Sequence, residues 1–240
     1  MTTKSSGKKN GGKGSGGLSG RNKSVRVRTA KGRKISSTRW LQRQLNDPYV
    51  AEARKLGYRS RAAFKLLELD EKYNLIKPGM RVVDLGAAPG GWTQVIQAKI
   101  KGKGQVVALD IQEMDDMPGA TVLHLDFMDD RAPERLKQAL DGPADLVVSD
   151  MAAPVTGHAP TDHLRIMGLV EAAVDFAGEV LAPGGTFVAK VFQGGTEAQL
   201  LAHIKLMFRT VRHAKPPSSR ADSSEIYLVA TGFRAEKPTD

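Results

Sequence analysis

Short runs of β-branched and apolar residues alternate with segments of helical periodicity between residues 81 and 208 of this chain. The runs predict five β-strands, at Arg81–Leu85, Gln105–Asp110, Thr121–Phe127, Ala144–Asp150 and Thr186–Phe192. The periodic segments predict helices at Trp92–Ile100, Ala132–Leu140, Asp162–Leu181 and Glu197–Phe208. This alternation is typical of an α/β fold, in which a parallel sheet carries helices on both faces.

The carboxyl-terminal region departs from the alternation. Thr210–Ala214 and Glu225–Thr231 both read as strands, and a Pro-Pro-Ser-Ser turn region stands between them instead of a helix. Without a helical crossover, the last strand is expected to run antiparallel to its neighbours. We therefore expect a seven-stranded, mostly parallel sheet with an antiparallel last strand.

Helical signals also precede the first strand. Ser37 and Thr38 can cap a short helix, Tyr49–Leu56 forms another, and Ser60 can cap a third helix over Arg61–Tyr73. Residues 37–77 are thus expected to form a helical segment, and residues 37–240 a single domain.

The positive charge of the chain is concentrated at its amino terminus. Residues 1–36 contain eleven Lys or Arg, eight Gly and no Asp or Glu, whereas the other 204 residues carry 25 basic and 26 acidic side chains. So few large apolar groups cannot bury enough surface to offset the entropy lost on ordering. We predict a disordered basic arm, which is either a solvated tail or an arm that binds RNA phosphates.

Composition excludes several classes of site. The 240 residues include no cysteine, which removes disulfides and cysteine-based zinc sites, and the five histidines show no metal-ligand spacing. The chain has no membrane-spanning run of about eighteen apolar residues and no amino-terminal secretory signal. We expect a cytoplasmic, monomeric protein that binds neither metal nor membrane.

A glycine-rich stretch, Asp84–Trp92, joins the first strand to the next helix. Such a loop brings backbone N–H groups and a helix N-terminus close to a ligand, although a plain tight turn has the same composition. Its sequence matches neither the dinucleotide fingerprint nor a phosphate-binding P-loop. About twenty residues later, Asp110 ends the second strand, where a carboxylate can accept both hydroxyls of an adenosine ribose. The pattern favours a nucleoside ligand without phosphates and with an amino-acid tail.

Acidic residues end four of the predicted strands, namely Asp84, Asp110, Asp126 and Asp150. One such residue is more often a turn former or a helix cap than a ligand-binding group. Ligands of open α/β sheets bind outside the carboxyl ends of the strands, so four carboxylates on that edge favour a binding site.

Lys190 lies in a strongly apolar strand, where an unpartnered ammonium group is costly to bury. It either extends to solvent at the strand end or acts as a general base, which at neutral pH requires a lowered pKa. Glu225 opens the last strand and has a solvated strand end as its simpler interpretation. On spacing alone, Lys65 favours an exposed helical pair with Glu68.

Ordered motifs extend from about Ser37 to Gly232. They are Ser37-x-x-Trp-Leu41, Ser60-Arg-Ala-x-Phe-Lys-Leu66, Asp84-Leu-Gly-Ala-Ala-Pro-Gly-Gly-Trp92, Ser149-Asp-Met151, Leu181-Ala-Pro-Gly-Gly185, Phe187-Val-x-Lys-Val-Phe-Gln193 and Ser218-Ser-Arg220. Together they resemble the FtsJ/RrmJ family of S-adenosylmethionine-dependent ribose 2′-O-methyltransferases, and within it the bacterial branch that acts on ribosomal RNA. The resemblance implies a Rossmann-like class I methyltransferase fold. The arm over residues 1–36 is longer and more basic than this branch leads us to expect.

The resemblance also implies roles for single residues. It implies a catalytic tetrad with Lys190 as proton acceptor, comprising Lys65, Asp150, Lys190 and Glu225. It implies that S-adenosylmethionine is bound by Gly90, Trp92, Asp110, Asp126 and Asp150. This assignment replaces the simpler interpretation of Lys65 as a surface residue.

Basic side chains near this edge are candidates for binding RNA. Arg54, Lys55, Arg59 and Arg61 lie in the helical segment, and Arg220 lies between the last two strands. By resemblance, the target is a uridine in the A-loop of 23S ribosomal RNA, within the large ribosomal subunit, and the activity belongs to ribosome biogenesis. Two alternatives remain: a ribose methyltransferase acting on transfer RNA, and a noncatalytic RNA-binding assembly factor.

Overall fold

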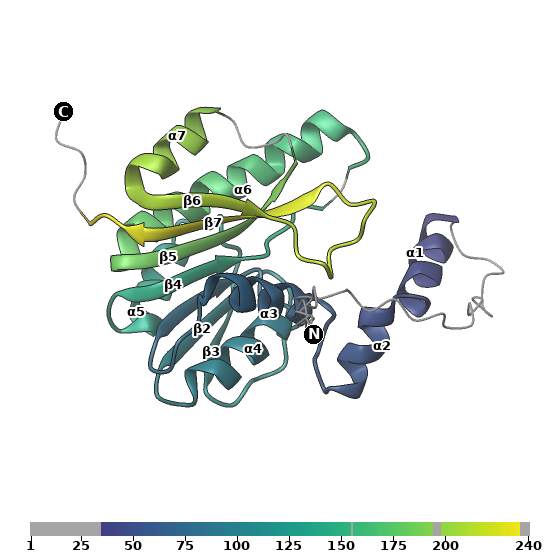
Figure 1. The fold of residues 1–240 in the computed structure, drawn as a ribbon, viewed down its shortest axis with the longest axis horizontal. Helices are drawn as coiled ribbons and strands as arrows, with labels where there is room; N and C mark the ends of the chain where they lie inside the picture. Colours follow the sequence, from purple (N-terminus) through teal and green to yellow (C-terminus); the bar gives the residue numbers. More distant parts are fainter. Residues whose placement is uncertain (1–34, 155, 194–197, 236–240) are drawn as a thin grey trace, which may run out of the picture.

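The computed structural model describes residues 35–154, 156–193 and 198–235, and nearly all of the predicted arm lies outside them (Figure 1). Seven strands form one sheet in the spatial order β3-β2-β1-β4-β5-β7-β6. Their bounds are β1 Arg81–Leu85, β2 Gln105–Asp110, β3 Ala120–His124, β4 Ala144–Ser149, β5 Leu181–Phe192, β6 Phe208–Ala214 and β7 Glu225–Phe233.

The pairing of the strands confirms the predicted fold class. Strands β3, β2, β1, β4 and β5 pair in parallel, and β7 pairs antiparallel with both β5 and β6. Strand β7 therefore inserts between β5 and β6 (Figure 1). The architecture is Rossmann-like.

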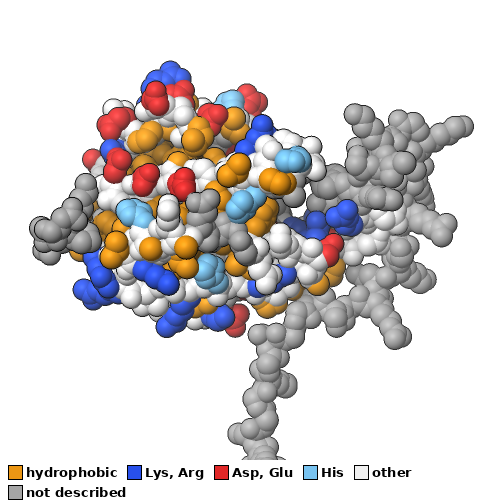
Figure 2. All heavy atoms as spheres, turned by 90° about the horizontal axis from the view of Figure 1, so that it is seen from above, with side chains coloured by type: hydrophobic (Ala, Val, Ile, Leu, Met, Phe, Trp, Pro, Cys, Tyr) orange, Lys and Arg blue, Asp and Glu red, His pale blue; other side chains and the backbone are white. Residues whose placement is uncertain are grey.

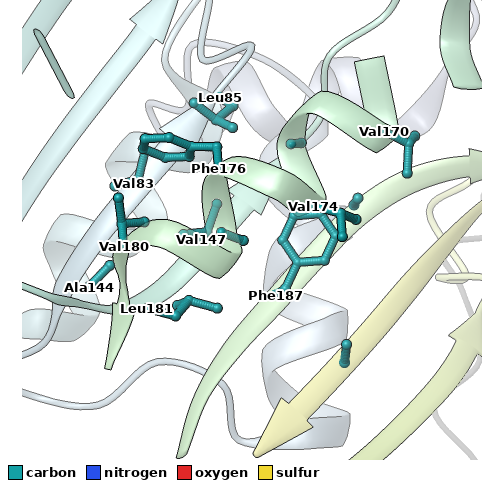
Figure 3. Close-up of a cluster of buried hydrophobic side chains, with 14 of the residues drawn as sticks. Val83, Leu85, Ala144, Val147, Val170, Val174, Phe176, Val180, Leu181 and Phe187 are labelled. Carbon is teal, nitrogen blue, oxygen red and sulfur yellow. The ribbon is translucent and has the colours of Figure 1, made fainter. Parts of the chain in front are cut away.

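Helices cover both faces of the sheet. Their bounds are α1 Ile35–Leu45, α2 Pro48–Lys55, α3 Ala62–Tyr73, α4 Gly91–Ile100, α5 Ala132–Leu140, α6 Ala159–Val180 and α7 Ala198–Met207. Buried residues of α3 and α4 form one apolar cluster with the sheet, and those of α5, α6 and α7 form another. In the second cluster, Val174 and Val180 of α6 lie over Val147 and Phe187 of the strands (Figure 3). The sheet is thus a central layer buried on both sides.

Some predicted bounds were wrong, for local reasons. Strand β3 ends at His124, three residues early, because the Asp126 carboxylate accepts the N–H of Met128 and turns the chain. Phe127 leaves the sheet and packs edge-on against Phe176 of α6. Strand β5 begins at Leu181, five residues early, where Leu181 pairs with Ala144 before an irregularity in the register.

The predicted cap at Ser60 is also wrong. Helix α3 begins after Arg61 without any side-chain cap. Within the described residues, the buried Ser60 hydroxyl has no hydrogen-bond partner and lies against Gly91, where a Cβ would come within 2.3 Å of Ser60 Oγ. Asp47 instead caps the preceding helix, α2, by accepting the N–H of Tyr49 at 3.1 Å. The predicted helix start at Glu197 lies outside the described residues.

Candidate active site

The glycine-rich loop after β1 lies against two neighbouring strands. Gly86 N and Ala87 N both donate hydrogen bonds to Leu109 O of β2, at 2.9 and 3.2 Å. Gly86 has a φ of +75°, and a Cβ there would stand 2.7 Å from Met151 N, just beyond β4. Only glycine fits this position, and its use brings the loop against the carboxyl ends of three strands.

A cavity of about 210 Å³ opens at this edge of the sheet. It is lined by Gly86, Ala88, Leu109, Asp110, Ile111, Gln112, Asp126, Phe127, Asp150, Met151, Ala152 and Leu169. Asp110 is fixed by two backbone donors: Ala88 N at 2.9 Å from Oδ2 and Gln112 N at 2.8 Å from Oδ1. Each oxygen keeps a lone pair for a further donor, such as a ribose hydroxyl.

The chemistry of this lining fits S-adenosylmethionine. Apolar side chains such as Ile111 and Phe127 suit an adenine ring, and Asp110 suits its ribose. The carboxylate of Asp150 suits the positive charges of the sulfonium and ammonium groups.

Not every residue expected to bind the cofactor reaches this cavity. Asp110, Asp126 and Asp150 line it, whereas Gly90 and Trp92 do not. Gly90 precedes α4 with a φ of +105° and faces Met117 and Arg59. The indole of Trp92 is buried in the core, where it donates to Ala62 O at 2.8 Å. These two residues shape the loop and its helix in the structure.

The four residues of the expected tetrad come together from three elements and from the residue that follows β4. Lys190 Nζ of β5 lies 3.0 Å from Asp150 Oδ1 and donates to Asp150 O at 2.6 Å. Lys65 Nζ of α3 lies 2.7 Å from Glu225 Oε1 of β7. Both lysines are mostly buried, with side chains 9% and 13% exposed, so the two surface interpretations do not apply.

Tyr227 joins the two pairs and was not predicted from the sequence. It stands opposite Lys190 across β5 and β7, and its hydroxyl donates to Asp150 Oδ1 at 2.8 Å. Lys65 Nζ lies 5.7 Å from the centre of its ring. A signal was present in the sequence, because Tyr227 follows Glu225 by two residues and so shares its face of the strand.

The charges of the site influence one another. Burial alone would raise the pKa of Asp150, but Lys190 and Lys65, with hydrogen bonds from Lys190 and Tyr227, hold it below its ordinary value. Burial raises the pKa of Tyr227 well above its ordinary value, and the negative charges of Asp150 and Glu225 add to the rise. Asp150 is therefore a stable carboxylate and Tyr227 a neutral hydrogen-bond donor.

The carboxyl group of Asp84 is fully buried behind the glycine-rich loop. Burial raises its pKa to about 7, and a hydrogen bond from Thr93 Oγ1 at 2.7 Å opposes the rise. Its other oxygen has no partner within the described residues. Asp84 does not line the cavity, unlike the other three acidic residues predicted at strand ends.

A second cavity, of about 330 Å³, adjoins the other side of the tetrad. It is lined by Arg43, Gln44, Arg61, Ala62, Lys65, Arg220, Asp222, Ser223 and Glu225. Lys65 and Glu225 belong to its wall, whereas Asp150 belongs to the wall of the first cavity. The linked lysine–carboxylate pairs thus lie between two cavities, the arrangement expected where a group passes between two ligands.

The basic residues expected to bind RNA divide into three sets. Arg61 and Arg220 line the second cavity. Arg54 and Lys55 are exposed at the end of α2. The guanidinium of Arg59 instead donates to the backbone carbonyls of Pro89, Asp115 and Asp116, so it fastens two loops together.

Metal binding and membrane spanning can also be examined in the structure. The described ranges contain no group of three His, Asp or Glu side chains that could hold a metal ion. Among the described helices, none combines the length and the apolar character needed to cross a membrane.

Comparison with protein families gives a match over most of the chain. Residues 58–233 match the family described as FtsJ-like methyltransferase. The matched range contains β1 to β7 and all four residues of the expected tetrad.

Individual proteins give a consistent result. The chain is 66% identical over 236 residues to ribosomal RNA large subunit methyltransferase E of Paramagnetospirillum magneticum, covering 95% of this chain and 97% of that protein. It is 58% identical over 248 residues to the protein of the same name from Parvibaculum lavamentivorans, covering 98% of each. A crystal structure of a ribosomal RNA methyltransferase from Plasmodium falciparum superimposes with a TM-score of 0.67 at 34% identity, covering 73% of this chain and 98% of that one.

Proposed function

Because the chain belongs to the FtsJ-like methyltransferase family, we propose that it transfers a methyl group from S-adenosylmethionine to a ribose 2′-hydroxyl of large-subunit ribosomal RNA. The observation that carries this proposal is the position of the two lysine–carboxylate pairs between the two cavities. The first cavity takes the cofactor, and the second takes the nucleotide. The names of the relatives, which refer to ribosomal RNA, support the choice of substrate.

The reaction needs one proton to be removed and two atoms to be aligned. The hydroxyl O–H bond breaks, a bond forms between that oxygen and the methyl carbon, and the bond from carbon to sulfur breaks. The cofactor supplies a methyl group that is already activated by its positive sulfur. A ribose hydroxyl is a weak nucleophile at neutral pH, so a positioned base accelerates the reaction.

Lys190 is the proposed proton acceptor, and it can accept only as a neutral amine. Asp150 fixes its Nζ through two contacts, one to the carboxylate and one to the backbone carbonyl. Lys65 and Glu225 stand on the side of the second cavity, where they position the hydroxyl. Asp110, Asp126 and Asp150, which line the first cavity, are the proposed cofactor-binding positions, and Gly90 and Trp92 would act through the shape of the loop beside it.

The RNA approaches over the second cavity. Arg61 and Arg220 would contact its backbone there, and Arg54 and Lys55, exposed at the end of α2, would extend the basic track. Arg59 is left out of this track, because its guanidinium donates to three backbone carbonyls. Figure 2 shows charges of both signs on one face of the body, in keeping with the near-neutral balance of residues 37–240. The proposed target is a uridine of the A-loop in the large ribosomal subunit, methylated in the cytoplasm by a monomer.

One assay tests this proposal. Labelled S-adenosylmethionine is offered with large ribosomal subunits lacking the modification, with free ribosomal RNA and with transfer RNA, and any 2′-O-methyl is mapped. We expect transfer to one uridine of the large subunit. Methylation of transfer RNA alone would show that transfer RNA is the substrate. Binding to RNA without methylation of any RNA would favour a noncatalytic assembly factor.

A further inference from the structure

Asp47 joins three segments that are far apart in the sequence. Its Oδ1 caps α2 through Tyr49 N at 3.1 Å, while its Oδ2 accepts hydrogen bonds from both Arg61 and Arg220. Its side chain is only 8% exposed. We infer that Asp47 is a positioning residue that sets the geometry of the Arg61–Arg220 pair, and thereby the affinity for RNA; the inference rests on the function proposed above.

The two guanidinium groups would separate without this carboxylate. Burial lowers the pKa of Arg61 below its ordinary value, and the nearby charge of Arg220 lowers it further, whereas Asp47 acts in the opposite direction. Arg220 Nε and Nη2 lie 3.3 and 3.1 Å from the same oxygen that Arg61 Nη1 contacts. One carboxylate therefore fixes two like charges on the rim of one cavity.

The segment that carries Arg220 is fastened to α3 by further contacts. Glu68 Oε2 accepts Ser218 N at 2.8 Å and Ser218 Oγ at 2.6 Å, and Arg61 Nη2 donates to Ser218 O. Glu225, the partner of Lys65, accepts Ser219 Oγ at 3.0 Å. The arginine pair is thus built into the same network as half of the tetrad.

Two arginines on one carboxylate leave an excess positive charge facing the 330 Å³ cavity. A phosphodiester group matches this arrangement, because guanidinium groups donate in a fixed fork geometry to phosphate oxygens. Their mutual orientation decides how many of those donors reach one phosphate. Asp47 controls that orientation without itself contacting RNA.

Replacing Asp47 should change the affinity for RNA in opposite directions, depending on whether its charge or its positioning of the arginines matters. Removing a negative charge beside an RNA site strengthens RNA binding if only net charge matters. If Asp47 positions the arginines, its removal weakens RNA binding. Ser and Asn both retain the ability to cap α2, so Asp47→Ser and Asp47→Asn leave that helix start intact.

The experiment compares these variants with Glu179→Gln, which removes one negative charge at the far end of α6, where Glu179 pairs with Lys137. We expect both Asp47 variants to raise the KM and the dissociation constant for ribosomal RNA about tenfold, with kcat changed less than about threefold. S-adenosylmethionine affinity should stay at the wild-type value, and Glu179→Gln should bind RNA as tightly as the wild type or slightly more tightly. In an Arg61→Ala/Arg220→Ala background, Asp47→Ser should have no further effect.

Other outcomes would overturn the inference. These are RNA affinity unchanged or increased in both Asp47 variants, or a fall in kcat at constant KM. If these variants do not fold, Asp47→Glu decides, since it keeps the charge and both arginines but displaces the carboxylate by one methylene group; RNA affinity at the wild-type value would then overturn the inference. Wild-type protein that binds RNA without methylating it would refute the proposed activity alone, because the affinities still test Asp47; wild-type protein that binds no RNA would refute both.

Discussion

The two cavities beside the tetrad are built by different means. The first cavity stands on the carboxyl ends of buried parallel strands, and its loop is fixed by backbone hydrogen bonds to Leu109. The second cavity stands between α3 and the segment before β7, which are joined by side-chain hydrogen bonds and ion pairs such as those of Asp47 and Glu68. The first depends on close packing, and the second on charge.

The two cavities should therefore respond differently to salt and to changes in side-chain shape. A backbone framework tolerates changes of salt but not of shape, because its atoms have no room to move. Charged contacts tolerate small changes of shape, but they weaken as salt screens them. Substitutions on the two sides should therefore differ in which ligand they affect and in how their effects respond to salt.

The largest effect is expected where the two sides meet, at Lys190. Lys190→Ala should lower kcat about a thousandfold, because it removes the proposed proton acceptor. Its affinity for S-adenosylmethionine, measured by calorimetry, should change little. Lys137→Ala, which removes a partly exposed lysine paired with Glu134 and Glu179, is the matched control. Turnover at the wild-type rate in Lys190→Ala would remove Lys190 from this role.

The next largest effect tests the backbone framework. Gly86→Ala should destabilise the protein by about 3 kcal/mol, since its Cβ would collide with Met151 in a left-handed conformation. Cofactor affinity should fall as well, because Gly86 lines the cavity. Gly57→Ala has nearly the same φ, +76°, with open space around it, and should lose only about 1 kcal/mol. Chemical unfolding of both variants measures the difference, and equal losses would contradict it.

Asp84, buried behind the glycine-rich loop, should make the free energy of unfolding depend on pH. Its pKa is raised to about 7 in the folded protein, whereas an unfolded carboxyl group titrates near 4. Between these values the folded state retains a proton that the unfolded state has lost. The contribution of Asp84 to stability should therefore fall as pH rises through this window, by about 1.4 kcal/mol per pH unit, and level off above it.

Asp84→Asn cannot titrate and isolates this contribution. Its amide oxygen can still accept the hydrogen bond of Thr93. The unfolding free energy of the wild type minus that of the variant should decline from pH 5 to pH 7 in chemical denaturation. A difference that is constant or increases over this range would show that Asp84 is already ionised at the lower pH.

The smallest effect concerns the charged framework. Ser218→Ala removes the 2.6 Å hydrogen bond to Glu68 and should lower the free energy of unfolding by about 1 kcal/mol. RNA affinity should fall by less than about threefold, while cofactor affinity should be unchanged. Ser224→Ala, at an exposed position nearby, is the control. A loss of cofactor affinity in Ser218→Ala would show that the two sides are not separate.

Local pattern was enough to predict most of the framework. The bounds of β1 and β2 match their predictions, because each is an apolar run delimited by turn residues. The end of β3 was missed, since its last apolar residue, Phe127, packs on a helix outside the sheet. The predicted cap at Ser60 does not form: a hydroxyl can cap a helix only if the chain turns suitably, and here the Ser60 side chain packs against Gly91.

The site residues also divide into those that the sequence could predict and those that it could not. Lys190 could be singled out from the sequence, because a lysine within an apolar strand is costly unless it has partners. Lys65 could not, since its spacing to Glu68 suggested a surface pair; in the structure Glu68 binds Ser218 instead, and Lys65 binds Glu225. The contacts of Tyr227 with Asp150 and of Asp47 with Arg220 join segments that are far apart in the sequence, so the fold was needed to identify them.

The sequence by itself determined the order of strands and helices, the glycine-rich loop and the carboxylate at Asp110, because these follow from local periodicity and backbone freedom. Only the tertiary structure decided which charges meet. Lys65 with Glu225, Lys190 with Asp150, and Asp47 with two arginines are each separated by many residues, Asp47 and Arg220 by 173. Such pairs form because burial makes an unpartnered charge unfavourable, and the packing of distant segments, not their sequence, selects the partner.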